Sequence, residues 1–206
     1  MESTCNGCFS LSLFSVHVYK NRAFNHEKIK DKALGYVKRQ YEKNPSTFPD
    51  AWDADVFTTF GKRIDFDWAD LMMLYQDNLI ELATQYGIAG DAYITDAWFN
   101  AYKKNQHQEI HEHLPGQFSA VHYLAYDKNV HSPTLFLSPY RQVSMSNAPP
   151  FKSNDPDFIP STWNQLSYIN VDEGDLIIFP SFLEHKVGRQ TTNKLRATIA
   201  FNFGFK

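Results

Sequence analysis

The feature that most constrains the fold is a change of pattern that begins at Ala92. From there onward, apolar and polar residues alternate in short runs, which Pro, Gly, Asn and Asp separate. Alternation with a period of two is typical of strands with one buried face, and several short strands at this spacing indicate an antiparallel sandwich or barrel. We expect strands at residues 92–103, 107–113, 117–126, 133–138, 165–171, 175–179, 184–189 and 195–204.

Helical periodicity dominates the chain before this region. Apolar residues recur at a spacing near 3.6 over about 25–43 and again over about 67–86, which predicts two amphipathic helices. Gly87 is a typical helix stop, because glycine adopts the left-handed backbone at low cost. Short runs rich in aromatic and β-branched residues predict further strands at 11–19 and 55–60.

The length of 206 residues suits one domain, and no linker-like segment divides it. We therefore expect a single domain over 1–206, mainly β, with helical support over about 25–90 and a β core over about 92–206. A proline-rich stretch with little periodicity, 139–162, predicts a long loop. Long loops of compact domains are often lids or binding loops.

The charged residues are scattered, which limits the kinds of partner. The formal net charge is -3, and the 20 lysines and arginines form no stripe of the kind that a nucleic-acid backbone requires. The apolar run near the start does not fit a signal peptide, and no apolar stretch approaches the length of a membrane span. We therefore predict no membrane partner. Cys5 and Cys8 supply only two of the four ligands of a structural zinc, and without a disulfide framework we expect a cytoplasmic location. The oligomeric state stays open, a homodimer included.

Two histidines near the end of one expected strand can bind a metal. In a strand, residues i and i+2 point to the same face, so His111 and His113 can reach one ion while Glu112 points away. Imidazole suits iron, copper, nickel and zinc, so the pair permits a metal without selecting one. On these residues alone the alternative stays open, namely that both histidines are exposed polar side chains beside a turn.

The last part of the chain adds a third imidazole and a guanidinium. His185 follows an apolar strand, and Arg196 begins the final strand eleven residues later, with Thr198 on the same face. A guanidinium binds a carboxylate through two parallel hydrogen bonds, which a lysine cannot do, and a neighbouring hydroxyl can add one more. The pattern therefore indicates a carboxylate-binding group close to the histidines.

The order and spacing of these residues resemble the 2-oxoglutarate/iron(II)-dependent oxygenase superfamily. The resemblance is to the branch, known from bacteria and phages, that reads H-x-H, then S-G-V-Y-Y-L, then F-P-S, H and R. It covers about residues 98–205, half of the chain. The matching segments read His111-Glu-His113-Leu-Pro-Gly-Gln-Phe-Ser119-Ala-Val-His122-Tyr123-Leu124, then Phe179-Pro180-Ser181-Phe-Leu-Glu-His185, Arg196 and Phe201-Asn202.

This resemblance implies a double-stranded β-helix, the jelly-roll or cupin-like fold, with iron(II) at one mouth. The iron ligands that it implies are His111, His113 and His185. The implied reaction uses O2 and 2-oxoglutarate to hydroxylate a small-molecule or peptide substrate, and it releases succinate and CO2.

The resemblance also implies residues for the co-substrate. Arg196 would pair with the distal carboxylate of 2-oxoglutarate, helped by Thr198 or by one of the tyrosines Tyr123 and Tyr102. His122 stands where relatives carry tyrosine, and we expect its imidazole to face the co-substrate.

One departure from the superfamily leaves alternatives open. The usual pattern is His-x-Asp or His-x-Glu, whereas this chain has His113 at the third place. Glu109 could supply the carboxylate instead, because His107-Gln-Glu109 is itself a His-x-Glu on the same strand face. Two other functions remain: a three-histidine cupin-type metal dioxygenase, such as a thiol dioxygenase, and a β-sandwich binding module without catalysis. Arg196 argues against the former, because such sites need no anchor for a distal carboxylate.

Overall fold

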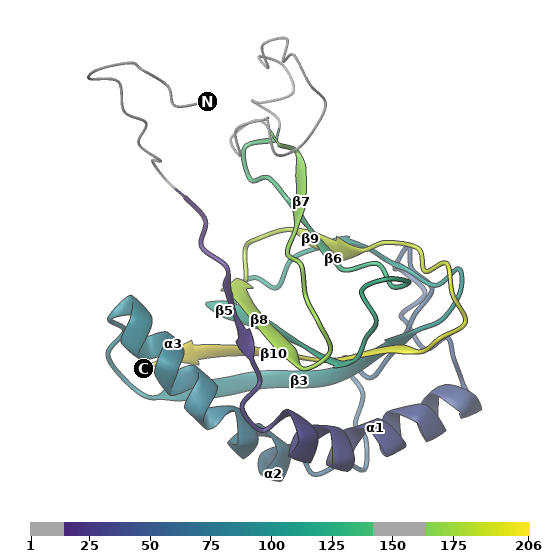
Figure 1. Cartoon of the computed structure of the whole chain (residues 1–206), viewed down its shortest axis with the longest axis horizontal. Coiled ribbons are helices and arrows are strands. Elements are labelled where there is room, and N and C mark those ends of the chain that lie inside the picture. Colours follow the sequence, from purple (N-terminus) through teal and green to yellow (C-terminus); the bar gives the residue numbers. More distant parts are fainter. Residues whose placement is uncertain (1–14, 142–163) are drawn as a thin grey trace.

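Two antiparallel sheets form the body of the structure, a computed structural model that describes residues 15–141 and 164–206. The larger sheet has the strand order β1-β8-β5-β10-β3-β2, and the smaller has the order β4-β9-β6-β7. Figure 1 shows three layers, with the helices below the large sheet and the small sheet above it. The elements are β1 (Tyr19–Arg22), α1 (His26–Lys43), β2 (Phe57–Thr58), α2 (Trp68–Met72), η1 (Met73–Tyr75), α3 (Gln76–Tyr86), β3 (Ala92–Tyr102), β4 (Gln108–His111), β5 (Phe118–Ala125), β6 (Thr134–Leu137), β7 (Leu166–Tyr168), β8 (Asp175–Pro180), β9 (His185–Val187) and β10 (Arg196–Phe205).

The strands expected after Ala92 are all present, and each pairs antiparallel with its neighbours. The mainly β class with antiparallel sheets is therefore confirmed. The observed strands differ chiefly in length. Where 165–171 was expected, β7 spans only three residues, because only these residues pair with β6.

The helical predictions are correct in position, but the second helix is interrupted. The helix expected over 25–43 is α1, whereas the one expected over 67–86 is divided into α2, the 3-10 turn η1 and α3. The interruption ends at Tyr75, whose fully buried ring packs against Phe201 of the large sheet. Contact with the sheet fixes this residue, and helical periodicity does not report such a contact. As predicted, Gly87 ends α3, with a left-handed φ of 64°.

The expected N-terminal strand is wrong in position. Residues 15–18 of the segment 11–19 have no regular structure, and the strand begins at Tyr19, where the chain pairs with β8. The strand expected over 55–60 shrinks to β2, because only two residues pair with β3. The expected loop 139–162 lies almost wholly outside the described residues.

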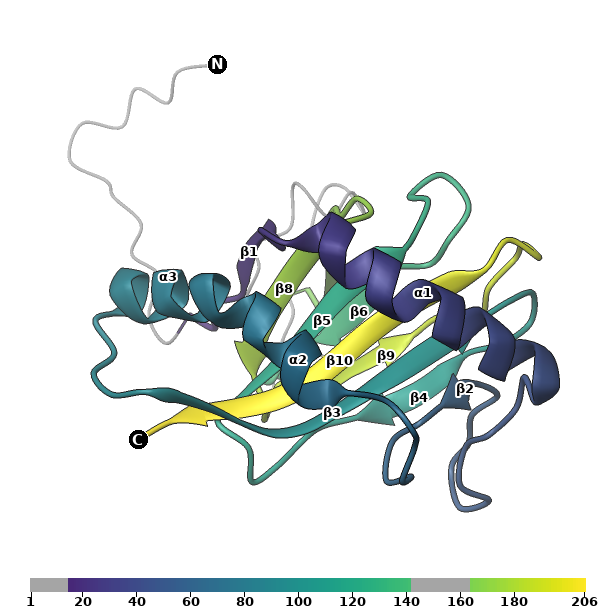
Figure 2. The same ribbon diagram turned by 90° about the horizontal axis from the view of Figure 1, so that it is seen from below.

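Both faces of the large sheet are buried. The helices cover the outer face, as Figure 2 shows, and join its apolar side chains in one core cluster that includes Ile29 and Val37 of α1 with Phe99, Leu124 and Phe201 of the strands. The inner face carries a second cluster, which includes Trp98, Val121, Ile177, Phe179 and Ala200. Alternate residues of β5 and β10 therefore serve two different cores, and only the inner face borders the site described next. Within the described ranges, no helix combines the length and the apolar character needed to cross a membrane.

Candidate metal centre

The structure brings the three predicted metal ligands together at one end of the small sheet. His111 and His185 are paired residues of the β4–β9 ladder, and His113 follows two residues beyond the end of β4. One ring nitrogen from each histidine lies within 4.8 Å of those of the other two. Three nitrogen donors at this separation can converge on a single transition-metal ion.

Hydrogen bonds fix the orientation of two of these rings. Nδ1 of His111 donates to the carbonyl of Glu109 at 2.8 Å, and Nδ1 of His185 donates to the carbonyl of Leu183 at 3.0 Å. A carbonyl only accepts, so Nδ1 carries the proton and Nε2 keeps a free lone pair. Metal-binding histidines are usually oriented in this way.

Burial keeps the three imidazoles neutral. It lowers the pKa of His113 to about 3, with His111 as a further cause. Burial likewise lowers the pKa of His111, and it holds the pKa of His185 well below the usual value. Neutral imidazoles have the lone pairs that a metal requires, so the donor set fits a divalent ion at neutral pH.

Arg196 brings an unpaired positive charge into the same cavity. Its side chain is 1% exposed, and Nε donates to the carbonyl of Ser132 at 3.2 Å. The other two nitrogens, Nη1 and Nη2, are buried without a hydrogen-bond partner in the described part of the chain. An unpaired buried charge is costly, and two parallel N–H groups match a carboxylate. The geometry therefore fits an anionic ligand with a carboxylate at this end.

Aromatic rings surround this guanidinium. Its central carbon lies 5.0 Å from the ring of Tyr102, 5.4 Å from that of Tyr123 and 6.0 Å from that of Tyr126. The hydroxyls of the two tyrosines predicted for the co-substrate have protein partners: Tyr102 donates to Gln108 Oε1 at 2.8 Å, and Tyr123 donates to Thr134 Oγ1 at 2.9 Å. In this arrangement both tyrosines confine Arg196 through their rings.

A cavity between the two sheets connects the histidines with the arginine. The residues that line it were in part predicted, namely the three histidines, Arg196, Thr198 and Tyr102. Tyr123 is not among its lining residues. The remaining lining residues are Trp98, Asn100, Gln108, Ser119, Ala120, Val121, Thr134, Phe179, Val187 and Ala200. Gln108, Ser119 and Thr134 line the cavity although no role was predicted for them. Ser119 lies four residues before Tyr123 on the same strand, so alternation along the strand is the signal that could have identified it.

The prediction for His122 is wrong. This residue points to the helix-covered face of β5, where its ring nitrogens lie 2.7 Å from the Tyr75 hydroxyl and 2.9 Å from Nδ1 of His26. Its neighbour Tyr123 points inward, and side chains alternate along a strand, so the two cannot both face the cavity. Burial lowers the pKa of His122 well below its usual value, and the ring serves as a neutral link between the sheet and the helices.

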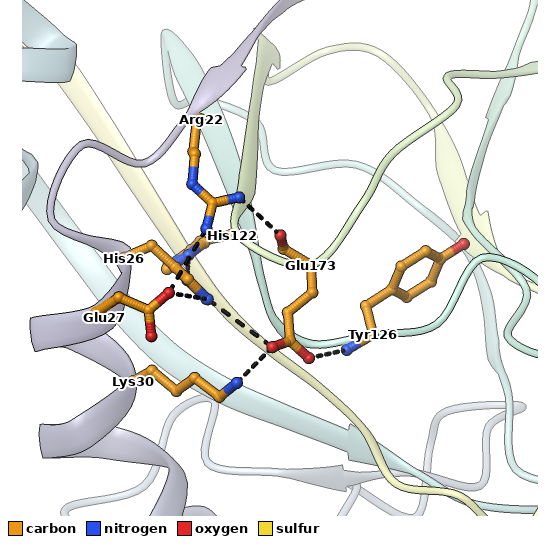
Figure 3. A network of polar contacts seen from close by, with 7 residues as sticks. All are labelled: Arg22, His26, Glu27, Lys30, His122, Tyr126 and Glu173. Atoms are coloured by element: carbon orange, nitrogen blue, oxygen red, sulfur yellow. Dashed lines mark hydrogen bonds and ion pairs between the residues drawn. The ribbon is translucent and has the colours of Figure 1, made fainter.

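Figure 3 shows the polar network to which His122 belongs. Nε2 of His26 lies 4.0 Å from Glu173, which pairs with Lys30 and accepts a hydrogen bond from the Tyr126 backbone nitrogen at 3.2 Å. Burial raises the pKa of Glu173, but the bonds from Lys30 and Tyr126 outweigh it and hold that pKa below its usual value. The network therefore ties α1 to the turn that precedes β8.

Glu109 is not part of the cluster that can hold an ion. Among the residues that the structure describes, His111, His113 and His185 form the group whose donor atoms converge, and Glu109 is absent from it. Its backbone carbonyl instead orients His111. The geometry thus favours His113 over Glu109 as the third donor.

Comparisons with known proteins agree with this geometry. A sequence model of the family described as "Putative 2OG-Fe(II) oxygenase" matches residues 96–202. No curated protein matches the chain. Solved structures do, at low identity: a prolyl-4-hydroxylase from Pseudomonas putida has 14% identity and a TM-score of 0.57, over 93% of this chain and 94% of that one.

Two further structures contain ligands. The viral collagen prolyl hydroxylase from Paramecium Bursaria Chlorella virus-1, in complex with 2OG, has 11% identity and a TM-score of 0.52, over 98% of each chain. HygX from Streptomyces hygroscopicus, with nickel, 2-oxoglutarate and hygromycin B bound, has 13% identity and a TM-score of 0.53, over 93% of this chain and 84% of that one. At these identities the likeness establishes a shared fold.

Proposed function

This chain belongs to the 2OG-Fe(II) oxygenase family, and on that premise we propose that its catalytic centre is the cavity between the two sheets. The family uses iron(II), 2-oxoglutarate and O2. We assign the iron to His111, His113 and His185, whose neutral ring nitrogens converge. The observation that carries the co-substrate assignment is the buried guanidinium of Arg196 with two unpaired nitrogens.

The protein groups have distinct roles in this proposal. Iron(II), when bound, supplies the activation of O2 that is coupled to decarboxylation of 2-oxoglutarate. Arg196 receives the distal carboxylate of 2-oxoglutarate, and the Thr198 hydroxyl, on the same face of β10, adds a donor. Tyr102 and Tyr123 exclude water from this end, which strengthens the charge pairing. The three histidines fix the position of the metal relative to that anchor.

The overall reaction is a hydroxylation. A substrate R–H, O2 and 2-oxoglutarate give R–OH, succinate and CO2, so one oxygen atom enters each organic product. The substrate is a small molecule or a peptide. This assignment draws on relatives of the same fold, because hygromycin B is bound in HygX and a peptide of hypoxia inducible factor is bound in a Trichoplax adhaerens prolyl hydroxylase.

A second cavity, of about 490 Å³, offers a path for that substrate. It borders His113 and the segment that follows, and its other lining residues include Phe60, Tyr93, Asp96 and Glu112. Among the residues that the structure describes, neither lysine nor arginine lines this cavity. Neutral or cationic substrates therefore suit this approach better than anionic ones.

The architecture that we propose is a double-stranded β-helix that forms, with its helices, one domain over 1–206. Support comes from the two facing antiparallel sheets, from one core cluster shared by helices and strands, and from the fold shared with oxygenases of known structure. The three-histidine cupin-type dioxygenase is disfavoured, because it would leave without a ligand the two Arg196 nitrogens that have no hydrogen-bond partner among the described residues.

Titration with manganese(II) tests the metal assignment. We expect one ion per chain for the wild type, and at least about tenfold weaker binding for His185→Ala and for His113→Ala, because each removes one of three donors. Glu112→Ala is the matched control, since Glu112 lies between two of the histidines in sequence but is not in the group of described donors that converge, so the affinity should stay unchanged. Wild-type affinity in His113→Ala would instead point to another third ligand, such as Glu109.

A further inference from the structure

His113 is the ligand that its own strand constrains least. His111 and His185 lie in the β4–β9 ladder, and Nδ1 of each donates to a carbonyl. His113 lies beyond the end of β4, and no hydrogen bond to its ring nitrogens is found within the described ranges. Its ring contacts Trp98, with the ring centres 5.3 Å apart. The position of His113 therefore depends on what holds the backbone of the segment around it.

Ser181 is the residue that holds this segment. The backbone nitrogen of His113 donates to the Ser181 carbonyl at 2.9 Å, and the Ser181 nitrogen donates to the carbonyl of Gln117 at 3.1 Å. Two backbone hydrogen bonds thus clamp residues 113–117 onto a single residue. Ser181 lies between β8 and β9, where the chain leaves the large sheet for the small one, four residues before His185.

The hydroxyl of Ser181 is in turn anchored to the large sheet. Its Oγ lies 2.9 Å from Oγ of Ser119 on β5, and Ser119 donates to Oδ1 of Asn202 on β10 at 2.8 Å. An amide oxygen only accepts, so the single proton of Ser119 goes to Asn202, and Ser181 must donate to Ser119. The three side chains are 0%, 2% and 7% exposed in the order Ser181, Ser119, Asn202, so water does not compete for these bonds.

The space between Ser181 and Gly116 leaves no room for a side chain on residue 116. A Cβ atom at Gly116 would lie 2.9 Å from Oγ of Ser181 and 2.9 Å from the carbonyl oxygen of His113. Glycine at this place therefore allows the clamped segment to lie directly against the serine hydroxyl. The backbone clamp and the hydroxyl chain together connect His113 to two central strands of the large sheet.

We propose that Ser181, held by Ser119 and Asn202, is the positioning residue for the metal ligand His113. The proposal rests on the proposed metal site. Removal of the hydroxyl leaves the backbone clamp and the pairing of Pro180 with Phe118 in place, but it removes the side-chain link to Ser119 and Asn202, so the segment that carries His113 gains freedom. Supporting groups of this kind commonly account for about 10- to 100-fold in metal affinity.

Manganese(II) titration of Ser181→Ala tests this role. We expect binding about tenfold weaker than in the wild type, and a smaller loss in the same direction for Ser119→Ala. Thr59→Val is the matched control, because the Thr59 hydroxyl is also buried and accepts a backbone hydrogen bond, from Phe99 at 2.9 Å, but does not line the metal cavity. Wild-type affinity in Ser181→Ala would overturn the proposal.

A double-mutant cycle with His113→Ala separates positioning from a general structural effect. If Ser181 acts through His113, then Ser181→Ala should change the affinity by less than about twofold once His113 is already removed, because coupled residues are not additive. An equal loss in both backgrounds would contradict the assignment to His113.

Hydrogen exchange of the metal-free protein gives a readout that needs no metal. We expect the peptide that covers residues 112–118 to exchange about tenfold faster in Ser181→Ala than in the wild type or in Thr59→Val. Unchanged exchange would overturn the proposal, whatever the metal titration gives. Failure of the wild type to bind manganese would instead count against the metal site itself. Failure of the Ser181 proposal and failure of the proposed metal site are therefore distinguishable.

Discussion

At Arg196, a full positive charge lies in the interior, and two of its three guanidinium nitrogens have no hydrogen-bond partner in the part of the chain that the structure describes. A folded protein rarely keeps such a group, because removing one partner of a buried ion pair costs about 3–5 kcal/mol. The neighbouring tyrosine rings offset part of this cost through cation–π contacts. A carboxylate ligand would offset the rest, so this residue indicates that the cavity takes an anionic ligand.

Replacement of Arg196 by lysine should affect the co-substrate selectively. Lysine keeps the charge but loses the two parallel donors, and a hydrogen bond to a charged group contributes about 1.5–3 kcal/mol. We therefore expect the KM for 2-oxoglutarate to rise about 10- to 100-fold in a succinate-release assay. Arg189→Lys, at an exposed arginine, is the control. An unchanged KM would mean that the co-substrate carboxylate binds elsewhere.

The strands and helices differ in how well the sequence predicts them. The period-two pattern correctly located the strands after Ala92, because most of them bury one face or both against a fixed neighbour. The exception is β7, whose three residues are all exposed. Composition misplaced the strand that begins at Tyr19, and helical periodicity missed the interruption that ends at Tyr75, since both features depend on contacts with distant strands. His111, His113, His185 and Arg196 were predicted because they belong to the motif shared with the oxygenase superfamily, and the structure brings them to one cavity. His122 was assigned to the wrong face because the motif was followed in place of the alternation around Tyr123.

Because His122 links the sheet to the helices, its replacement should lower the stability of the fold and leave co-substrate binding unchanged. His122→Leu leaves the Tyr75 hydroxyl and Nδ1 of His26 buried without this partner. Each buried polar group left unsatisfied costs about 1–3 kcal/mol, so urea unfolding should show a clear loss of stability. The KM for 2-oxoglutarate should stay within about twofold of the wild type. A large rise in that KM with normal stability would return His122 to the co-substrate site.

Across the whole molecule, the burial of histidines makes the stability of the fold depend on pH. Burial lowers the pKa of six histidines below the usual 6.5, namely His26, His111, His113, His122, His131 and His185. Below pH 6.5 the unfolded chain therefore binds protons that the folded chain does not. Stability is then lost as the pH falls, because protons favour the state that binds more of them.

Chemical denaturation of the metal-free protein at several pH values checks this response. The free energy of unfolding should fall between pH 7 and pH 5, with a slope of at most about 1.4 kcal/mol per pH unit for each histidine that stays neutral in the fold. His122→Leu should show a shallower slope, since one such group is gone. A free energy of unfolding that does not change over this range would contradict the burial of these imidazoles.

The two sheets bring three converging histidines and the buried Arg196 guanidinium to one cavity, and the proposed function rests on this pairing. The test is to add 2-oxoglutarate to the iron(II)-loaded protein without oxygen and to record the visible spectrum. We expect a weak charge-transfer band that saturates with 2-oxoglutarate and that requires a higher concentration in Arg196→Lys. A spectrum that does not change at saturating 2-oxoglutarate would contradict the proposed function.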